Sequence, residues 1–294
     1  MFYRRKIILA LLEQFGEELE KLRFQKLLFL ISQYQETPSF DFVPYKFGCY
    51  SFHATADLRT LQKYGYVEEG QIKWTLLKNE NILQELKDED QNHIKRLKKY
   101  HINSSVDTLI KLTYRKYPYY AIKSEVANRH LNKEELSVVE KLIPKGKEKT
   151  LFTIGYEGIS IEKYLNKLIK NDVKLLCDVR KNPLSRKTGF SKKSLTSYCN
   201  AVGIEYLHVP SFGIDGSQRK NLNTQEDYNQ LFDKYEQDVL IPKFEDLDQF
   251  TELVNKYDQI ALTCFEAESC QCHRGRIADI LKTKSTWNYK IKHI

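Results

Sequence analysis

The second half of the sequence alternates short apolar runs with amphipathic segments, and this alternation limits the fold more than any other feature. Strands separated by helices need right-handed crossovers, which produce a mainly parallel sheet covered on both faces. We therefore predict an α/β domain over residues 149–294. The four apolar runs that fit buried strands lie in LFTIGYEG (151–158), VKLLCDVRKNPLSR (173–186), IEYLHVPSFG (204–213) and QIALTCFEAE (259–268).

Polar and glycine residues follow each of these runs. Ligands of open parallel sheets gather at the carboxyl ends of the strands, so we expect a site among these residues. They are Gly155, Tyr156, Glu157 and Gly158; Asp178, Arg180 and Arg186; His208, Phe212 and Gly213; and Cys264, Glu266, Cys272, His273 and Arg274.

The segment TCFEAESCQCHRGRIADIL (263–281) holds three of the six cysteines of the chain. A structural zinc site prefers two separated ligand pairs, whereas these cysteines form one local cluster. Neighbouring Cys272 and His273 also have difficulty in reaching one ion, so we expect no metal. The spacing from Cys264 or Cys272 to Arg274 does not fit the phosphate cradle of tyrosine phosphatases either.

An anion site suits these residues better. His273 and Arg274 lie at the expected start of the closing helix, where free backbone N–H groups favour negative charge. Arg180 and Arg186 can add forked donors that fit phosphate. Such a pocket lowers the pKa of Cys272 or Cys264 and makes one of them a candidate nucleophile, with His273 as proton carrier and Asp178 or Glu266 as base or orienting group. The alternative is a binding scaffold in which Cys264 is a core residue and Asp178 and Arg180 form a simple ion pair.

Four boxes of this half resemble the DUF488 family: TIGYEG, LLCDVRKNPLSRKTGFSKKSL, GIEYLHVPSFG and LTCFEAESCQCHRGRIA, in this order over about residues 150–285. The resemblance implies an α/β fold and an active site lined by the Asp-Val-Arg and Cys-His-Arg boxes, without an established reaction. Cys270 lies outside the family box, which disfavours a mechanism that needs it. With the strand-end positions, the resemblance indicates catalytic residues Cys272, His273, Arg274, Asp178, Arg180, Cys264 and Glu266, and ligand-binding residues Tyr156, Gly155, Glu157, Ser185, Arg186 and Phe190.

The first half is typical of a small α+β module. Helical spacing over 5–15 and 22–31 is followed by an extended aromatic stretch over 40–52 and by a third helix that ends at Gly65. The sequence YVEEGQIKWTL (66–76) then predicts a hairpin. Three helices and a hairpin are the order of a winged helix-turn-helix, which we expect over residues 1–78.

This half resembles the Panacea-type, antitoxin-associated domain through LRFQKLLFLISQYQ, FDFVPYKFGCYS and ATADLRTLQKYGYVEE. The resemblance implies a module that binds DNA or a protein partner, often beside or fused to prokaryotic conflict and mobile-element genes. For DNA, the third helix would present His53, Thr55, Arg59 and Lys63, and the wing would present Lys73. Alternatively, these are solvated residues of a helix that holds a core or a protein partner.

Residues 79–148 have helical spacing and mixed charge, so we expect a helical connector that ends in IPKGKEKT. The net charge of +8 suits a polyanionic partner and equally suits solubility. No apolar run approaches the ~18 residues of a membrane span. Six unevenly spaced cysteines do not resemble a disulfide framework, which favours a reducing compartment, the cytoplasm.

The sequence therefore predicts a protein that binds a phosphate-bearing ligand, a nucleotide or nucleic acid, and acts on it, with a first module that binds DNA or a partner protein. The alternative is a non-enzymatic regulator or antitoxin-like interaction protein that senses an anion or nucleotide. The sequence does not identify a cofactor or an oligomeric state, so both are unknown at this point.

Overall fold

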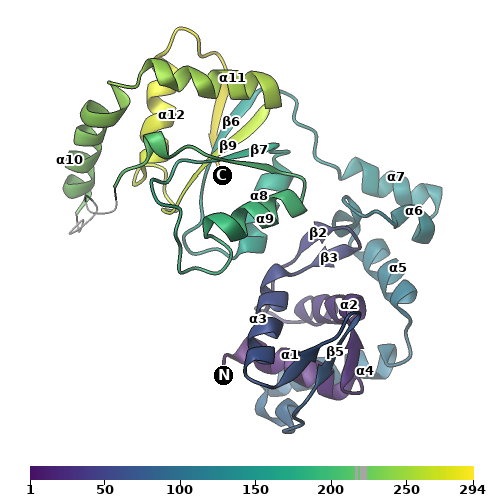
Figure 1. Cartoon of the computed structure of the whole chain (residues 1–294). Helices are drawn as coiled ribbons and strands as arrows, with labels where there is room; N and C mark the ends of the chain where they lie inside the picture. The colour runs from purple at the N-terminus through teal and green to yellow at the C-terminus, as the bar shows by residue number, and fades with distance from the viewer. Residues whose placement is uncertain (216–217, 219–223) are drawn as a thin grey trace. The chain divides into compact units, whose positions relative to one another are not determined.

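The computed structural model describes residues 1–215, 218 and 224–294. The chain divides into two compact units, Met1–Ile143 and Pro144–Ile294 (Figure 1). The finer division of the first 148 residues into a module over 1–78 and a connector over 79–148 stays a prediction. None of the helices in the described part of the chain has the length and apolar character that a membrane span requires.

The first unit combines helices with short antiparallel strands. The predicted helix over 52–64 and the predicted hairpin are confirmed as α3 and as the pair β4 and β5. The third strand of their sheet is β1, and the sheet order is β1-β5-β4. The bounds are α1 Tyr3–Gln14, β1 Glu18–Glu20, α2 Lys21–Ser32, β2 Val43–Tyr45, β3 Gly48–Tyr50, α3 Phe52–Lys63, β4 Val67–Glu69 and β5 Lys73–Leu76. A winged-helix identity for this unit stays a prediction.

Helices occupy the rest of the first unit. They are η1 Ile82–Glu85, α4 Asp88–His101, α5 Val106–Lys116, η2 Pro118–Ala121, α6 Ala127–His130 and α7 Lys133–Lys141. A single core runs from α1 and α2 to α4, because Ile8, Leu28 and Leu97 all belong to one cluster of buried apolar side chains. Residues from the expected connector therefore help to bury the apolar faces of the first two helices.

The second unit is the predicted α/β domain, with a five-stranded sheet of order β10-β6-β9-β7-β8. Every neighbouring pair is parallel. The bounds are β6 Thr150–Gly155, α8 Ile161–Lys170, β7 Leu175–Asp178, α9 Lys192–Ala201, β8 Glu205–His208, η3 Pro210–Phe212, α10 Gln225–Tyr235, η5 Glu236–Leu240, η6 Glu245–Leu247, α11 Asp248–Tyr257, β9 Gln259–Cys264, α12 His273–Thr283 and β10 Lys290–His293.

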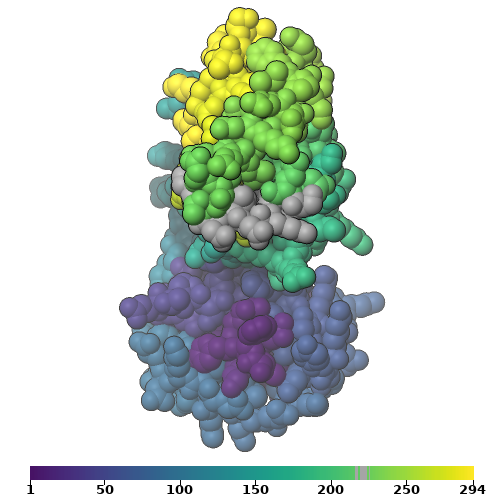
Figure 2. Space-filling model, turned by 90° about the vertical axis from the view of Figure 1, so that its left-hand side faces the viewer, coloured from purple at the N-terminus to yellow at the C-terminus, as the bar shows by residue number. Residues whose placement is uncertain are grey.

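Helices cover both faces of this sheet. The strands β6, β7 and β9 are buried along their whole length, as strands covered on two faces must be. On one face α11 and α12 lie side by side, and α8 and α9 lie on the other (Figure 1). Figure 2 shows the light-green surface around residue 250 next to the yellow surface of the C-terminal segment. Phe250 of α11 and Ile277 of α12 pack into one core with Leu262 of β9.

The fifth strand, β10, was missed from the sequence. The four predicted strands leave out the stretch KTKSTWNYKIKHI (282–294), but Lys290–His293 pairs with β6 in parallel register. The lysines conceal the strand pattern, because an edge strand is bonded on one side and tolerates charged side chains. Lys290 and Lys292 are exposed, whereas Trp287 just before the strand is buried.

Candidate functional site

The carboxyl ends of four strands, β6, β9, β7 and β8, meet at one edge of the sheet. Gly155 at the end of β6 lies opposite Cys264 of β9, and Asp178 at the end of β7 lies opposite Thr263. His208 of β8 is the partner of Asp178 on the other side. The boxes that lie more than 100 residues apart in the sequence are therefore adjacent in space, as the parallel topology predicts.

A pocket of about 390 Å³ opens at this edge. It collects six of the predicted site residues, and it adds residues that sequence reasoning did not select. The predicted ones are Tyr156, Arg180, Ser185, Arg186, Cys264 and His273, and the others are Lys181, Asn182, Leu184, Ile214 and Phe265. The contiguous basic sequence Arg180-Lys181 was a signal for Lys181 that we did not use.

Arg180 is held in a fixed orientation by Asp178. The Arg180 Nε donates to Asp178 Oδ1 at 2.8 Å, and Nη2 donates to Oδ2 at 2.5 Å. Tyr206 also donates to the carboxylate, at 2.6 Å. Burial would lower the pKa of Arg180, but the carboxylate outweighs burial and raises this pKa above its ordinary value. Asp178 is fully buried, and Arg180 is 6% exposed.

Arg180 also contacts the aromatic wall of the pocket. Its Nη1 donates to the hydroxyl of Tyr156 at 2.8 Å and to the carbonyl of Phe190 at 2.9 Å. The rings of Tyr156 and Phe190 are stacked, with centroids 4.3 Å apart. Burial raises the pKa of Tyr156, so the hydroxyl stays protonated near neutral pH. Phe190 thus supports the wall from behind and does not line the pocket.

The loop Phe265–Ala267 closes over the end of β6. The Phe265 carbonyl accepts from the backbone N–H groups of Tyr156 and Glu157 at 3.0 and 2.9 Å. Gly155 permits this approach, because a Cβ there would lie 1.8 Å from the Glu266 carbonyl oxygen. The Glu157 carboxylate accepts from the N–H of Ala267 at 3.0 Å. Gly155 and Glu157 therefore hold the loop in place.

Arg274 belongs to this loop rather than to the pocket. We expected its guanidinium to bind an anion, but its Nη1 donates to the Glu266 carbonyl at 2.6 Å and its Nη2 donates to the Ala267 carbonyl at 2.8 Å. The side chain is 1% exposed. Two of its donor nitrogens are thus committed to backbone, and the structure does not bring Arg274 together with Arg180 and Arg186.

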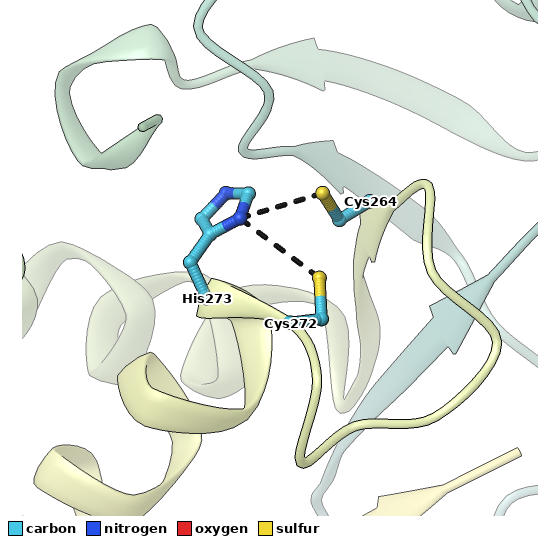
Figure 3. Close-up of side chains that lie close together, drawn as sticks. All are labelled: Cys264, Cys272 and His273. Carbon is cyan, nitrogen blue, oxygen red and sulfur yellow. Dashed lines mark hydrogen bonds between the residues drawn. The ribbon is translucent and has the colours of Figure 1, made fainter. Parts of the chain in front are cut away.

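Cys264, Cys272 and His273 form a compact cluster at the inner wall of the pocket, which Cys264 and His273 line (Figure 3). Their three ligand atoms lie within 4.8 Å of one another. The His273 Nδ1 lies 3.4 Å from the Cys264 Sγ and 3.9 Å from the Cys272 Sγ. Cys264 comes from the end of β9, whereas Cys272 and His273 come from the start of α12. These residues can serve as a thiol–imidazole pair or as ligands of one metal ion.

The tautomer of His273 follows from its other nitrogen. Nε2 lies 2.9 Å from the carbonyl oxygen of Val179, which can only accept, so Nε2 carries the hydrogen. The Nδ1 lone pair of the neutral ring therefore faces the two sulfur atoms. Cys264 also lies 3.4 Å from Glu266 Oε2, so its single S–H has two acceptors within reach.

The expected activation of Cys272 by a low pKa is not observed. Burial raises the pKa of the Cys272 thiol well above its ordinary value, and the neighbouring Cys264 raises it further. Cys272 is fully buried and does not line the pocket, whereas Cys264 does. Two of the arginines that we expected to stabilise a Cys272 thiolate are bound elsewhere, Arg180 to Asp178 and Arg274 to the loop. Of the two thiols, Cys264 is the one that a ligand can approach.

The predicted nucleic-acid residues of the first unit differ in exposure. Arg59 and Lys63 are exposed one turn apart on α3. Lys73 bonds to Glu18 on the neighbouring strand at 2.5 Å. His53 is half-buried, and burial lowers its pKa, as does the nearby Arg4. Arg59 and Lys63 remain the two residues best placed to meet a partner.

The family comparison covers most of the second unit. No curated protein and no solved structure matches the chain. The family model described as a domain of unknown function, DUF488, matches residues 160–281, which contain β7, β9 and the start of α12. The match lies within the second unit and covers less than half of the chain, so the similarity to this family concerns the second unit alone.

Proposed function

We propose that the second unit binds a phosphate-bearing ligand, a nucleotide or nucleic acid, in the pocket at the sheet edge and acts on it there. One observation carries the proposal: the described residues of the pocket wall include three cationic side chains and none that is acidic. Arg180 is neutralised by Asp178, but Lys181 and Arg186 are exposed. A pocket with this balance attracts anions.

Lys181 and Arg186 are the residues that would hold the phosphate. Neither forms an ion pair with a residue in the described part of the chain, so their donors remain available to a ligand. The planar guanidinium of Arg186 suits two oxygens of one phosphate, and the ammonium of Lys181 supplies a point charge. The aromatic ring of Tyr156 in the same wall offers a surface for a base.

A chemical reaction of the bound ligand would involve the residues at the inner wall of the pocket. Cys264 and His273 are the pocket residues that can form a bond to a ligand or move a proton. The second candidate is a regulator that binds without chemistry. The observation that favours it is the buried ion pair of Asp178 and Arg180, because these two groups satisfy each other without a ligand.

The first unit would bring the DNA or the partner on which the second unit acts. The support is the pair of exposed cations on α3, Arg59 and Lys63, at a spacing of one helical turn. A duplex bound there would contact phosphates, and its affinity would fall as salt rises.

A ligand screen tests the proposal. We would measure the melting temperature of the full chain with inorganic phosphate, nucleoside triphosphates, a dinucleotide, short RNA and duplex DNA. A bound ligand raises the melting temperature by mass action. We expect stabilisation by at least one nucleotide or nucleic acid, and about tenfold weaker binding after Lys181→Ala or Arg186→Ala.

The matched control is Lys193→Ala, which removes an exposed lysine of α9 that does not line the pocket. If no phosphate-bearing compound stabilises the chain, or if all three variants bind equally well, the proposed pocket is wrong. Loss of duplex binding after Arg59→Ala with Lys63→Ala supports the first unit as the DNA-binding part. A ligand that binds the wild type and is returned unchanged supports the regulator.

A further inference from the structure

We propose that Cys264, Cys272 and His273 bind a zinc ion whose fourth coordination position opens into the pocket. The sequence argued against a metal because Cys272 and His273 are neighbours. In the structure Cys272 is the last residue before α12 and has extended backbone angles, φ −140° and ψ 138°, whereas His273 starts the helix. This change of backbone conformation lets the two side chains turn to one point (Figure 3).

The distances within the cluster fit tetrahedral coordination. Zinc bonds of ~2.3 Å to sulfur and ~2.1 Å to nitrogen place the two donor atoms about 3.6 Å apart at tetrahedral angles. The observed separations of the His273 Nδ1 from the two sulfur atoms are 3.4 Å to Cys264 and 3.9 Å to Cys272. Both separations lie within a few tenths of an ångström of the tetrahedral value.

The surroundings of His273 are those of a metal ligand. A ligating histidine usually donates its second ring N–H to a carboxylate or a backbone carbonyl, which fixes the ring orientation. His273 does this with the carbonyl of Val179 at 2.9 Å. Its Nδ1 lone pair then faces both sulfur atoms, so one cation can bind all three atoms.

Charge and ligand type favour zinc. Two thiolates neutralise the charge of a divalent ion, which lowers the cost of placing that ion in a buried site. Two cysteines and one histidine with an open position form a known ligand set for catalytic zinc. Cys264 and His273 line the pocket and Cys272 lies behind them, so the open position faces the pocket.

The metal would change the role of Cys264 from nucleophile to ligand. A water molecule at the open position would lose a proton near neutral pH, since zinc lowers the pKa of its bound water to about 7. The same pocket wall carries Lys181 and Arg186. The metal site itself does not depend on the identity of the anion or on the proposed function.

The test is titration of the reduced, metal-free full chain with Co²⁺, followed by competition with Zn²⁺. We expect one cobalt per chain, with the thiolate charge-transfer band and the visible absorption of tetrahedral cobalt, both abolished by zinc. Cys264→Ser, Cys272→Ser and His273→Gln should each weaken binding by at least about 100-fold, more than the loss of a supporting hydrogen bond. The matched control is Cys270→Ser, because Cys270 is exposed and lies outside the cluster.

A second measurement requires no variant. X-ray absorption of the zinc-loaded wild type should show two sulfur ligands at ~2.3 Å and lighter ligands at ~2.0–2.1 Å. Absence of stoichiometric binding in the wild type, a first shell without sulfur, or loss of binding in Cys270→Ser alone would overturn the site. Metal binding that survives Lys181→Ala and Arg186→Ala, with loss of phosphate binding, would separate this site from the proposed function.

Discussion

Each unit holds a buried aspartate that is bound by arginine, Asp57 in the first unit and Asp178 in the second, and the two ion pairs differ in what they connect. In the first unit, Asp57 of α3 accepts from Arg4 at 2.5 Å and from Arg5 at 2.7 Å, both from α1. In the second unit, Asp178 accepts from Arg180, which is two residues further along the same strand end. The first cluster links distant elements, whereas the second orients a side chain beside a pocket.

The difference shows that an ion pair cannot be assigned a role from its chemistry alone. Both carboxylates are buried, at 2% exposure for Asp57 and 0% for Asp178. The arginines differ, because the side chains of Arg4 and Arg5 are 29% and 14% exposed and that of Arg180 is 7% exposed. If the aspartate is lost, water can therefore hydrate the charges of Arg4 and Arg5, whereas it reaches the charge of Arg180 much less.

The largest effect is expected for Asp178→Asn. This substitution keeps the shape of the side chain but leaves the Arg180 charge buried, so the second unit should lose about 3 kcal/mol of unfolding free energy. Urea unfolding checks this, with the buried Trp287 as the fluorescent reporter of the second unit and Trp74 replaced by Phe. Asp279→Asn, at an exposed ion pair with Lys282, is the matched control and should change little. Equal stability of the two variants would contradict the prediction.

A smaller loss, about 1–2 kcal/mol, is expected for Asp57→Asn in the first unit, because Arg4 and Arg5 reach solvent. The reporter is Trp74, in a chain with Trp287→Phe. Asp107→Asn removes an exposed carboxylate of the same unit as a control. A loss at Asp57 that exceeds the loss at Asp178 would mean that burial of the arginine does not decide the cost.

The smallest effect is expected for the pH dependence of the unfolding free energy of the first unit. Burial lowers the pKa of His53, so the unfolded chain takes up the proton at a higher pH than the folded chain. The unfolding free energy of the first unit should therefore fall as pH drops below about 6.5, and His53→Gln should remove part of this fall. Unfolding of the first unit at several pH values between neutral and moderately acidic measures the slope.

The groups whose charges act on His53 are Arg4 and Arg5 of α1, Asp57 of α3 and Asp41. His101 changes in the same direction through burial, so it remains as a background in the variant. The same slope in the wild type and in His53→Gln would show that His53 does not contribute.

Much of the fold could be predicted from local pattern. Buried parallel strands are short apolar runs, so β6, β7 and β9 were recognisable, whereas the lysine-rich β10 was not. The meeting of the strand ends also followed from topology, and it explains why Tyr156, Arg180 and Cys264 share one pocket. The direction in which the Arg274 side chain points could not be predicted. Its guanidinium donates to two backbone carbonyls of the loop that closes over Gly155, and residue spacing does not place that loop.

The sequence by itself determined that the second unit is an α/β domain whose polar residues follow the carboxyl ends of the strands, because apolar periodicity and strand order act locally and along the chain. The tertiary structure decided which charges remain available to a ligand. Arg180 and Arg274 are committed to Asp178 and to backbone, whereas Lys181 and Arg186 are exposed. It also brought Cys264 to Cys272 and His273. Hydrogen-bond partners and side-chain directions come from segments far apart in the chain, and residue spacing alone cannot supply them.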